Sequence, residues 1–331
     1  MSLTSEQFND LMGRPFGGAF EHVQTIAVGV SGGGDSMALL WLLQEWCAVH
    51  DKILHVLSVD HGLRKAARGE CESVADYCAA FEHVQHHILT WEAPKNVRVQ
   101  EGARKARYAL MRGYCFERGI QHLFLAHHQG DQAETVLFRL AKGSGLDGLA
   151  GMRMVQEMDG LLLCRPLLHV PKDDLVAVCD AQGIEYVDDP SNVDDGYARV
   201  RLRQSMDILS AEGLSEKRLS VIAMRMARAR DALDDITQKA FADHLLFKNT
   251  NRIEFKISIC DAHDEIVLRL LLMCISDIGL DRDYAPRMEK VEDLMFSLKH
   301  DVSFRKRTLG GVIFERDDVN KRLILACEKS E

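Results

Sequence analysis

A short apolar run that leads into three consecutive glycines decides the fold assignment of this chain: Thr25-Ile26-Ala27-Val28-Gly29-Val30-Ser31-Gly32-Gly33-Gly34-Asp35-Ser36. Residues 25–30 predict a buried strand, and the apolar pattern of residues 36–49 predicts a helix. Glycines between a strand and a helix let the backbone turn tightly, and the free N–H groups at the helix start then point at a bound anion. The stretch therefore predicts a phosphate-binding loop, with an ordinary glycine-rich connection as the alternative.

The same alternation of strands and helices continues to about residue 190. Strands are expected at 53–59, 86–89, 122–126 and 161–163, and helices at 66–81, 100–118, 131–141 and 171–182. Strands separated by helices of this length form parallel sheets, and ligands bind at the carboxyl ends of their strands. We therefore predict an α/β fold with a doubly wound parallel sheet, in which the glycine-rich loop lies at the ligand-binding edge.

The pattern changes after residue 204, and we expect two domains, 1–204 and 205–331. The second begins with a linker helix, in which apolar residues follow heptad spacing at 222, 226, 229, 233, 236 and 240. This spacing is typical of a helix that packs on a core, with a coiled-coil partner as the alternative. Helices near 263–277 and 284–299 and short strands within 302–327 predict a second, smaller domain of helical or α+β type.

Composition excludes several classes of protein. The chain has 331 residues, 47% of them hydrophobic, and 41 basic residues against 50 acidic ones. The net charge of −9 argues against a basic nucleic-acid coat, but charges are screened over about 8 Å, so a local basic patch can still bind RNA. The nine cysteines include no C-x-x-C pair, which favours reduced thiols and a cytoplasmic protein. No run reaches the ~18 apolar residues of a membrane span, so no membrane partner is expected.

The form of the glycine-rich loop narrows its ligand. The chain lacks both G-x-x-x-x-G-K-[ST] and G-x-G-x-x-G. The pattern Ser-Gly-Gly-x-Asp-Ser instead resembles the N-type ATP pyrophosphatases (adenine nucleotide alpha hydrolase-like proteins). The resemblance implies that ATP is the cofactor and that the loop holds its pyrophosphate end through Ser31, Gly32, Gly33, Gly34, Asp35 and Ser36. Asp35 would then be a Mg²⁺ ligand, because Mg²⁺ commonly takes one or two carboxylates together with phosphate oxygens.

Further motifs narrow the resemblance to one family within that superfamily. They are Val59-Asp60-His61-Gly62-Leu63-Arg64, Ala103-Arg104 with Arg107-Tyr108, Ala126-His127-His128, Asp131-Gln132-Ala133-Glu134-Thr135, Gly143-Ser144-Gly145-Leu146, Gly148-Leu149-Ala150-Gly151-Met152, Asp189-Pro190-Ser191-Asn192, and Arg199-Val200-Arg201-Leu202-Arg203. Together they resemble the tRNA(Ile)-lysidine synthetases, strongly over residues 25–204 and more weakly over 305–311.

This resemblance implies an ATP-dependent ligase that modifies tRNA. ATP would adenylate the C2 oxygen of the wobble cytidine in a tRNA(Ile) with a CAU anticodon and release pyrophosphate, and free L-lysine would then attack C2 and displace AMP. A tRNA thiolase with the same loop is the alternative, although such enzymes typically need paired cysteines. A small-molecule amide ligase such as NAD synthetase, and an inactive nucleotide- or RNA-binding module, are further alternatives. The sequence leaves open whether the chain is a monomer or a homodimer.

The resemblance also assigns roles to individual residues. Arg104 and Arg107 would hold the α-phosphate or the tRNA, and a solvated basic helix face is the alternative. Asp131 and Glu134 would hold the incoming lysine amine, with Asp131 sharing Mg²⁺ with Asp35; acids favoured by the helix dipole are the alternative. His61 would lie near the nucleotide.

Two positions depart from the family's usual pattern. Gly130 stands where the family usually has the first Asp of His-His-x-Asp-Asp, and Val200 stands where the family usually has the Asn of Arg-Asn-Arg. His127 and His128 could also be interpreted as metal ligands, but the sequence supplies no regularly spaced fourth ligand for zinc.

Overall fold

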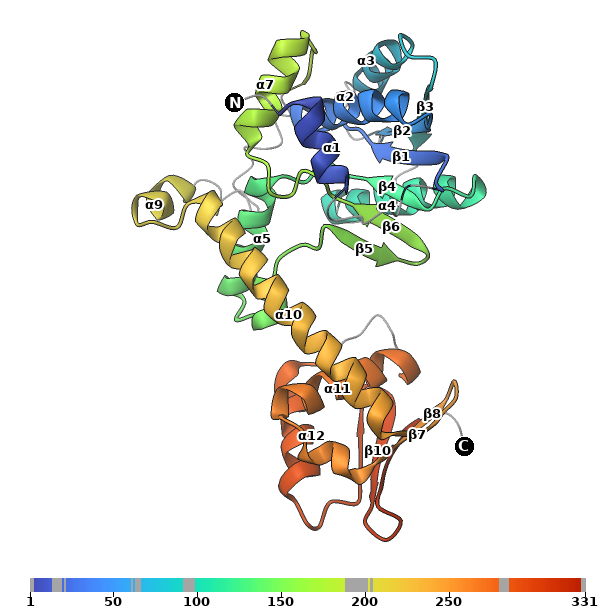
Figure 1. Cartoon of the computed structure of the whole chain (residues 1–331), viewed down its shortest axis with the longest axis vertical. Coiled ribbons are helices and arrows are strands. Elements are labelled where there is room, and N and C mark those ends of the chain that lie inside the picture. The colour runs from blue at the N-terminus through green and yellow to red at the C-terminus, as the bar shows by residue number, and fades with distance from the viewer. Residues whose placement is uncertain are drawn as a thin grey trace. The chain divides into compact units, whose positions relative to one another are not determined.

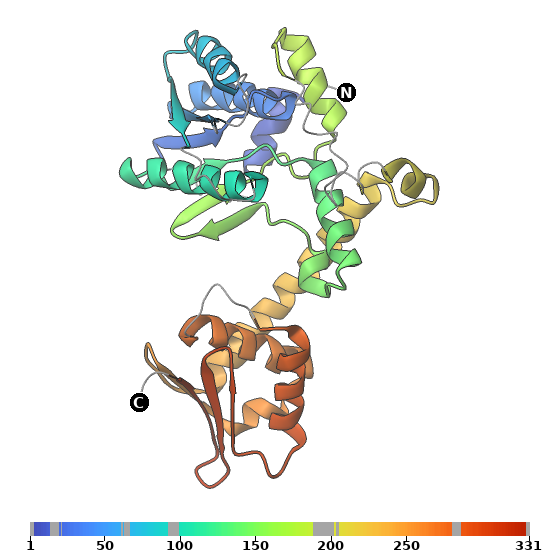
Figure 2. The same ribbon diagram turned by 180° about the vertical axis from the view of Figure 1, so that it is seen from behind.

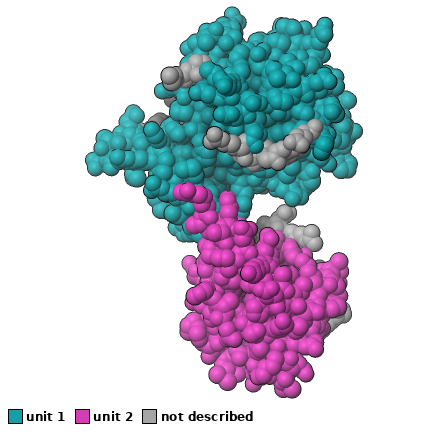
Figure 3. All heavy atoms as spheres, viewed as in Figure 1, with its two compact units in different colours: residues 1–227 teal, residues 228–331 magenta. Residues whose placement is uncertain are grey.

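The computed structural model describes residues 3–13, 20, 22–60, 62, 67–91, 99–187, 202, 205–279 and 286–328, with the backbone alone at 99–101 and 103. The chain forms two compact units, Met1–Ala227 and Arg228–Glu331, which Figure 3 shows in different colours. The two units divide between residues 227 and 228, inside a helix. The domain boundary expected from the sequence, between residues 204 and 205, stays a prediction. Each unit is described by itself below.

The first unit is built on a six-stranded sheet. Its strands are β1 (Thr25–Gly29), β2 (Ile53–Asp60), β3 (Val84–Thr90), β4 (His122–Phe124), β5 (Val155–Met158) and β6 (Leu161–Cys164). They lie in the order β3-β2-β1-β4-β6-β5, and all neighbours are parallel except β5 and β6. The predicted doubly wound parallel sheet is confirmed, with one antiparallel edge strand that we had not predicted.

Helices cover both faces of this sheet. They are α1 (Ser5–Gly13), α2 (Gly34–Val49), α3 (Ala67–Cys78), α4 (Val99–Glu117) and α7 (Lys172–Gln182). Helices α1, α2, α3 and α7 pack on one face and α4 on the other (Figures 1 and 2). Strand β1 shows why a layer of helices is needed on each face, because Ile26 and Val28 contribute to one core and Ala27 to the other. Alternate residues of a strand point to opposite faces, so a strand that is apolar on both must be covered twice.

The first unit has a third hydrophobic core, in which helices that come later in the chain pack on the helix that follows β4. The helices are α5 (Gln129–Ala141), α6 (Leu146–Leu149), α9 (Met206–Ala211) and α10 (Glu216–His244). Ala133 and Val136 of α5 pack with Leu219 and Ala223 of α10. The heptad prediction for α10 holds only in part, because Ile236 is 53% exposed whereas Ala240 packs against the core of the second unit. The buried residues form a neighbouring stripe, which includes Ala223, Arg230 and Thr237.

The second unit is an α+β domain, as predicted. A five-stranded antiparallel sheet runs in the order β7-β8-β11-β10-β9. Its elements are β7 (Leu245–Lys248), β8 (Arg252–Lys256), the 3₁₀ helix η2 (Ile257–Asp261), α11 (Asp264–Ile278), α12 (Met288–His300), β9 (Lys306–Leu309), β10 (Val312–Asp317) and β11 (Arg322–Cys327). Phe255, Phe314 and Leu325 point from one face of the sheet into a core that they share with α11 and α12. The hairpin of β7 and β8 was missed by the sequence analysis.

None of the described helices combines the length and the apolar character that crossing a bilayer requires.

Candidate active site

The candidate active site lies where the order of the strands reverses. From β1 the chain proceeds outward to β2 and β3, and then returns to place β4 on the other side of β1 (Figure 1). In open α/β sheets a ligand binds at such a switch point, outside the carboxyl ends of the two strands. Here the glycine-rich loop follows β1, and the two adjacent histidines follow β4. The topology therefore brings together two motifs that lie about ninety residues apart in the sequence.

The glycine-rich loop is held by its own hydrogen bonds. Gly32 has a φ of +85°, a conformation that side chains rarely adopt. The hydroxyl of Ser36 donates to the carbonyl of Gly33 at 2.8 Å, and it accepts from the backbone N–H of Ser31 at 3.2 Å. The hydroxyl of Ser31 lies 3.2 Å from the same oxygen and, because the proton of Ser36 is already committed, acts as the donor. The Ser36 side chain is thus saturated, and it shapes the loop from within.

The close packing of the loop explains a second glycine. A Cβ at Gly34 would lie 3.2 Å from the ring of Tyr186. The backbone N–H of Val187 donates to the carbonyl of Gly32 at 2.9 Å, so the segment around 186 fixes the loop from outside. Helix α2 begins at Gly34, and its first N–H groups supply the positive end of the helix dipole. This geometry suits an anion such as a phosphate.

An imidazole lies between two carboxylates at this edge of the sheet. Nε2 of His128 is 3.5 Å from Oδ2 of Asp35 and 3.6 Å from Oδ2 of Asp131. Asp131 is fixed by a capping box at the start of α5: its carboxylate accepts the backbone N–H of His128 at 3.0 Å. Two of the predicted site residues, Asp35 and Asp131, are therefore brought to one group that we had not assigned to the site.

The backbone sets the protonation of His128. The N–H of Gly130 donates to Nδ1 of His128 at 3.0 Å, so in this arrangement Nδ1 carries no proton and the ring presents Nε2–H to the carboxylates. Burial by itself lowers the pKa of His128, but the hydrogen bond with Asp35 and the charge of Asp131 outweigh it and raise the pKa above its ordinary value. Protonation would cost the bond from Gly130, because Nδ1 would then become a donor facing a donor.

Gly130, the departure from the family pattern, has a structural reason here. A Cβ at this position would lie 2.9 Å from Cε1 of His128 and 3.2 Å from both Nδ1 of that ring and Oε1 of Glu216. Any side chain at residue 130 would therefore press on the imidazole that bridges the two acids. The glycine allows His128 to fold back onto the helix start.

The carboxylate of Asp35 fits a magnesium ligand. Its Oδ1 atom is buried and has no hydrogen-bond partner, which is costly for a charged oxygen unless a ligand satisfies it. Carboxylate oxygens are what Mg²⁺ prefers in proteins, usually with phosphate oxygens beside them. Within the described part of the chain, no three His, Cys, Asp or Glu side chains gather around a point where a metal ion could bind.

Cationic side chains gather at the same edge of the sheet. Arg104 and Arg107 of α4 both lie over the ring of Tyr108, at 5.3 and 5.8 Å from its centre. Burial lowers the pKa of Arg107, as it does for Arg165, which follows β6. Burial and the charges of these three arginines lower the pKa of His127 to about 4, against the attraction of Asp131. Arg165 belongs to this group and was missed by the sequence analysis.

The remaining predicted residues lie on α5 or outside the described part of the chain. Glu134 is half-buried on α5, one turn after Asp131. His61, the segment 189–192 and the arginines at 199, 201 and 203 lie outside the described residues, so their predicted roles stay predictions.

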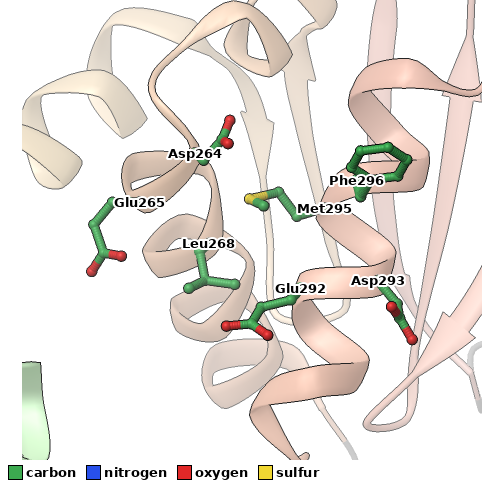
Figure 4. Close-up of a pocket in the computed structure, with 7 residues that line it drawn as sticks. All are labelled: Asp264, Glu265, Leu268, Glu292, Asp293, Met295 and Phe296. Atoms are coloured by element: carbon green, nitrogen blue, oxygen red, sulfur yellow. The ribbon is translucent and has the colours of Figure 1, made fainter. Parts of the chain in front are cut away.

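A separate hollow of about 410 Å³ occurs in the second unit, between α11 and α12. Four of its lining residues are carboxylates, Asp264 and Glu265 from α11 and Glu292 and Asp293 from α12 (Figure 4). A surface of this sign repels phosphate groups. The hollow is therefore no alternative site for a nucleotide.

Comparison with known proteins gives the family. Residues 3–208 match the PP-loop domain family. A tRNA(Ile)-lysidine synthase from Rhodopseudomonas palustris is 38% identical over 302 residues, which cover 87% of this chain and 86% of that protein. The chain belongs to the tRNA(Ile)-lysidine synthase family. A further lysidine synthase, from Methylobacterium sp., is 36% identical over 95% of this chain and 92% of its own length.

A solved structure with much lower sequence identity to this chain than the lysidine synthases shows the same fold. The U34-tRNA thiolase NcsA from Methanococcus maripaludis, solved with its [4Fe-4S] cluster, has a TM-score of 0.55 and 16% identity, and it covers 70% of this chain and 79% of its own. In the present chain all nine cysteines are free and eight are buried. Burial raises the pKa of Cys47, Cys115 and Cys164 to about 12, the opposite of what a reactive thiolate needs.

Proposed function

We propose that this ATP-using, tRNA-modifying ligase joins free L-lysine to C2 of the wobble cytidine of a tRNA(Ile) with a CAU anticodon. The C2 oxygen attacks the α-phosphorus of ATP, the bond between the α- and β-phosphates breaks, and pyrophosphate leaves. The ε-amine of lysine then attacks C2, the bond from C2 to oxygen breaks, and AMP leaves. Adenylation is the logical first step, because a phosphate ester leaves far more readily than a carbonyl oxygen.

The glycine-rich loop at the switch point carries this proposal. Backbone N–H groups at the start of α2, with the turn fixed by Ser36, suit the pyrophosphate end of ATP. The orphaned Oδ1 of Asp35 supports a role for this residue in holding Mg²⁺ beside those phosphates. When bound, the ion would neutralise negative charge on the departing pyrophosphate.

The carboxylates at the start of α5 suit the second half of the reaction. Asp131 and Glu134 lie at i and i+3 and can attract the ammonium group of lysine. Lysine has a reference pKa of about 10.4, so a proton must be removed before the amine can attack. We propose that Glu134 accepts this proton, which resolves the conflict between attracting the cation and activating the amine. Nε2 of His128 lies between Asp35 and Asp131, 3.5 and 3.6 Å from their nearest carboxylate oxygens, and the backbone N–H of His128 fixes Asp131.

The arginines of α4 suit the phosphate that is transferred. Arg104 and Arg107 present guanidinium groups from one helix face, a geometry that binds phosphate oxygens in pairs. Single-stranded anticodon loops are where proteins usually reach RNA bases, so the wobble base can be turned out toward this edge. The second unit and the basic residues at 305–307 remain candidates for contacts to the rest of the tRNA.

The test combines the protein with ATP, Mg²⁺, labelled lysine and unmodified tRNA(Ile), and it measures lysine incorporation and pyrophosphate release. We expect incorporation to require all components, and a tRNA with uridine at the wobble position to accept no lysine. Incorporation without tRNA, or a requirement for sulfide, contradicts the proposal and favours the amide-ligase or thiolase alternative.

A further inference from the structure

Arg165 is a buried cation whose partners among the described residues are all neutral. It follows β6 at the ligand-binding edge, and only 5% of its surface is exposed. Its Nε donates to Nδ1 of His127 at 3.3 Å, one terminal nitrogen donates to the carbonyl of Arg153 at 2.9 Å, and the other to Oε1 of Gln156 at 3.1 Å. No carboxylate among the described residues lies within ion-pair distance of it.

A buried charge of this kind is expensive to maintain. Proteins usually pair a buried guanidinium with a carboxylate, as this chain does for Arg269 with Asp234 and Glu265. At residue 156 a carboxylate would need no more room than the amide does, yet the chain has glutamine. Arg165 also lies close enough to Arg104 to be repelled by its charge. The arrangement accumulates positive charge instead of cancelling it.

The contact with His127 has a chemical consequence. A guanidinium has only donors, so Nδ1 of His127 must accept and cannot carry a proton. The ring is therefore held in the form that carries its proton on Nε2. An imidazole in this form offers one N–H donor, at the strand end beside the glycine-rich loop.

We propose that Arg165 is a positioning residue for a nucleotide phosphate at this edge: its uncompensated charge attracts the phosphate, and its bond to Nδ1 fixes His127 as a hydrogen-bond donor to it. The phosphate belongs either to ATP or to the tRNA. This inference rests on the proposed function for the identity of the two nucleotides, while the attraction of a phosphate rests on the charge of Arg165, which no carboxylate among the described residues pairs.

The substitution Gln156→Glu tests the missing counter-charge directly. It keeps the hydrogen bond to Arg165 and gives the guanidinium a carboxylate partner. If Arg165 serves the fold alone, this variant keeps or raises Tm and binds nucleotides as the wild type does. We expect Tm to be kept or raised, but the Kd for ATP with Mg²⁺ or for tRNA(Ile), measured separately by calorimetry, to rise roughly tenfold, as one unit charge several ångströms away would cause.

Two controls match this variant. Gln156→Ala removes the same hydrogen bond without adding charge, and Gln121→Glu adds the same charge before β4, at the other end of that strand. We expect both to bind ATP and tRNA within twofold of the wild type. If Gln156→Glu raises the Kd for ATP alone, the phosphate belongs to ATP. If it raises the Kd for tRNA alone, the phosphate belongs to the tRNA. Unchanged Kd values for both ligands in Gln156→Glu overturn the proposal.

A second measurement follows His127 itself. In protein with ¹⁵N-labelled histidine, we expect the wild type to show His127 with its proton on Nε2, and Arg165→Lys to show a mixture of the two neutral forms. An unchanged form in that variant overturns the positioning role. Binding and tautomer are measured without turnover, so failure to form lysidine would contradict the proposed function and leave this inference standing.

Discussion

The substitution Ser36→Ala separates the shape of the glycine-rich loop from its charge. The hydroxyl of Ser36 makes three hydrogen bonds inside the loop, and the residue is only 7% exposed. Alanine removes all three without adding bulk. The carbonyl of Gly33 keeps the N–H groups of Ser36 and Met37 as donors, whereas the N–H of Ser31 loses the hydroxyl that it contacts.

The expected size of the effect follows from these bonds. Each intramolecular hydrogen bond contributes about 0.5–1.5 kcal/mol net, and the exposed position of Ser31 lets water replace part of the loss. We therefore expect the free energy of unfolding to fall by about 1–2 kcal/mol, which lowers Tm by about 2–8 °C for a unit of this size. Because the loop is no longer fixed before ATP arrives, the KM for ATP should rise roughly tenfold.

The assays are thermal unfolding and pyrophosphate release at varied ATP concentration. Ser31→Ala is the matched control, because it removes one of the three bonds and leaves the other two with Ser36. We expect it to produce less than half of both effects. If Ser36→Ala unfolds and turns over like Ser31→Ala, the hydroxyl of Ser36 does not shape the loop and the argument fails.

Three further predictions concern the reaction and the cores. Asp35→Ala should abolish pyrophosphate release while tRNA is still retained on a filter, because the orphaned oxygen serves the phosphates; an active variant would remove Asp35 from the mechanism. Glu134→Gln should lower turnover at saturating lysine, whereas full turnover there rules out its role as a base. Burial, with the charges of His87 and Arg118, lowers the pKa of His55 to about 4, so its contribution to stability is complete above the unfolded pKa of about 6.5 and is lost as the pH falls toward 4. The loss amounts to at most about 3 kcal/mol, and denaturant titrations of His55→Gln should show a flatter acid limb than the wild type; equal slopes would contradict this assignment.

The parallel sheet could be predicted from the sequence because its signals are local. The run from Thr25 to Val30 is apolar on both faces, and Gly119 and Gly183 end their helices with positive φ, as expected of a helix C-terminus. That the glycine-rich loop lies at a sheet edge follows from such signals alone. The identity of the strands that pair with β1 cannot be predicted in this way, because pairing between distant segments leaves no pattern in either segment alone.

The missed elements differ in whether a signal was present. Strand β5 forms a hairpin with β6 through Asp159 and Gly160, both with positive φ, and this Asp-Gly pair directly before the apolar run Leu161–Cys164 is a hairpin signal that could have found it. The hairpin of β7 and β8 gives less warning, because it follows the long helix α10 directly and its outer strand is largely exposed.

The residues of the site likewise divide into those that a sequence motif marks and those that only the structure reveals. Asp35 and Asp131 could be assigned from their motifs, because both follow strand ends within recognisable patterns. The bridge that His128 makes between them depends on space at Gly130, which appears only when the ring is placed against the helix start. Arg165 was not singled out by any motif, since its interest lies in a buried guanidinium that has no carboxylate partner among the residues that the structure describes.

The most direct test of the account is a crystal structure with α,β-methylene-ATP and Mg²⁺, an analogue in which carbon replaces the oxygen between the two phosphates that the reaction separates. We expect the β- and γ-phosphates to bind the backbone N–H groups between Gly32 and Ser36, with the ion within coordinating distance of Asp35 Oδ1. A triphosphate bound away from residues 31–36, or an ion that does not contact Asp35, would contradict the account.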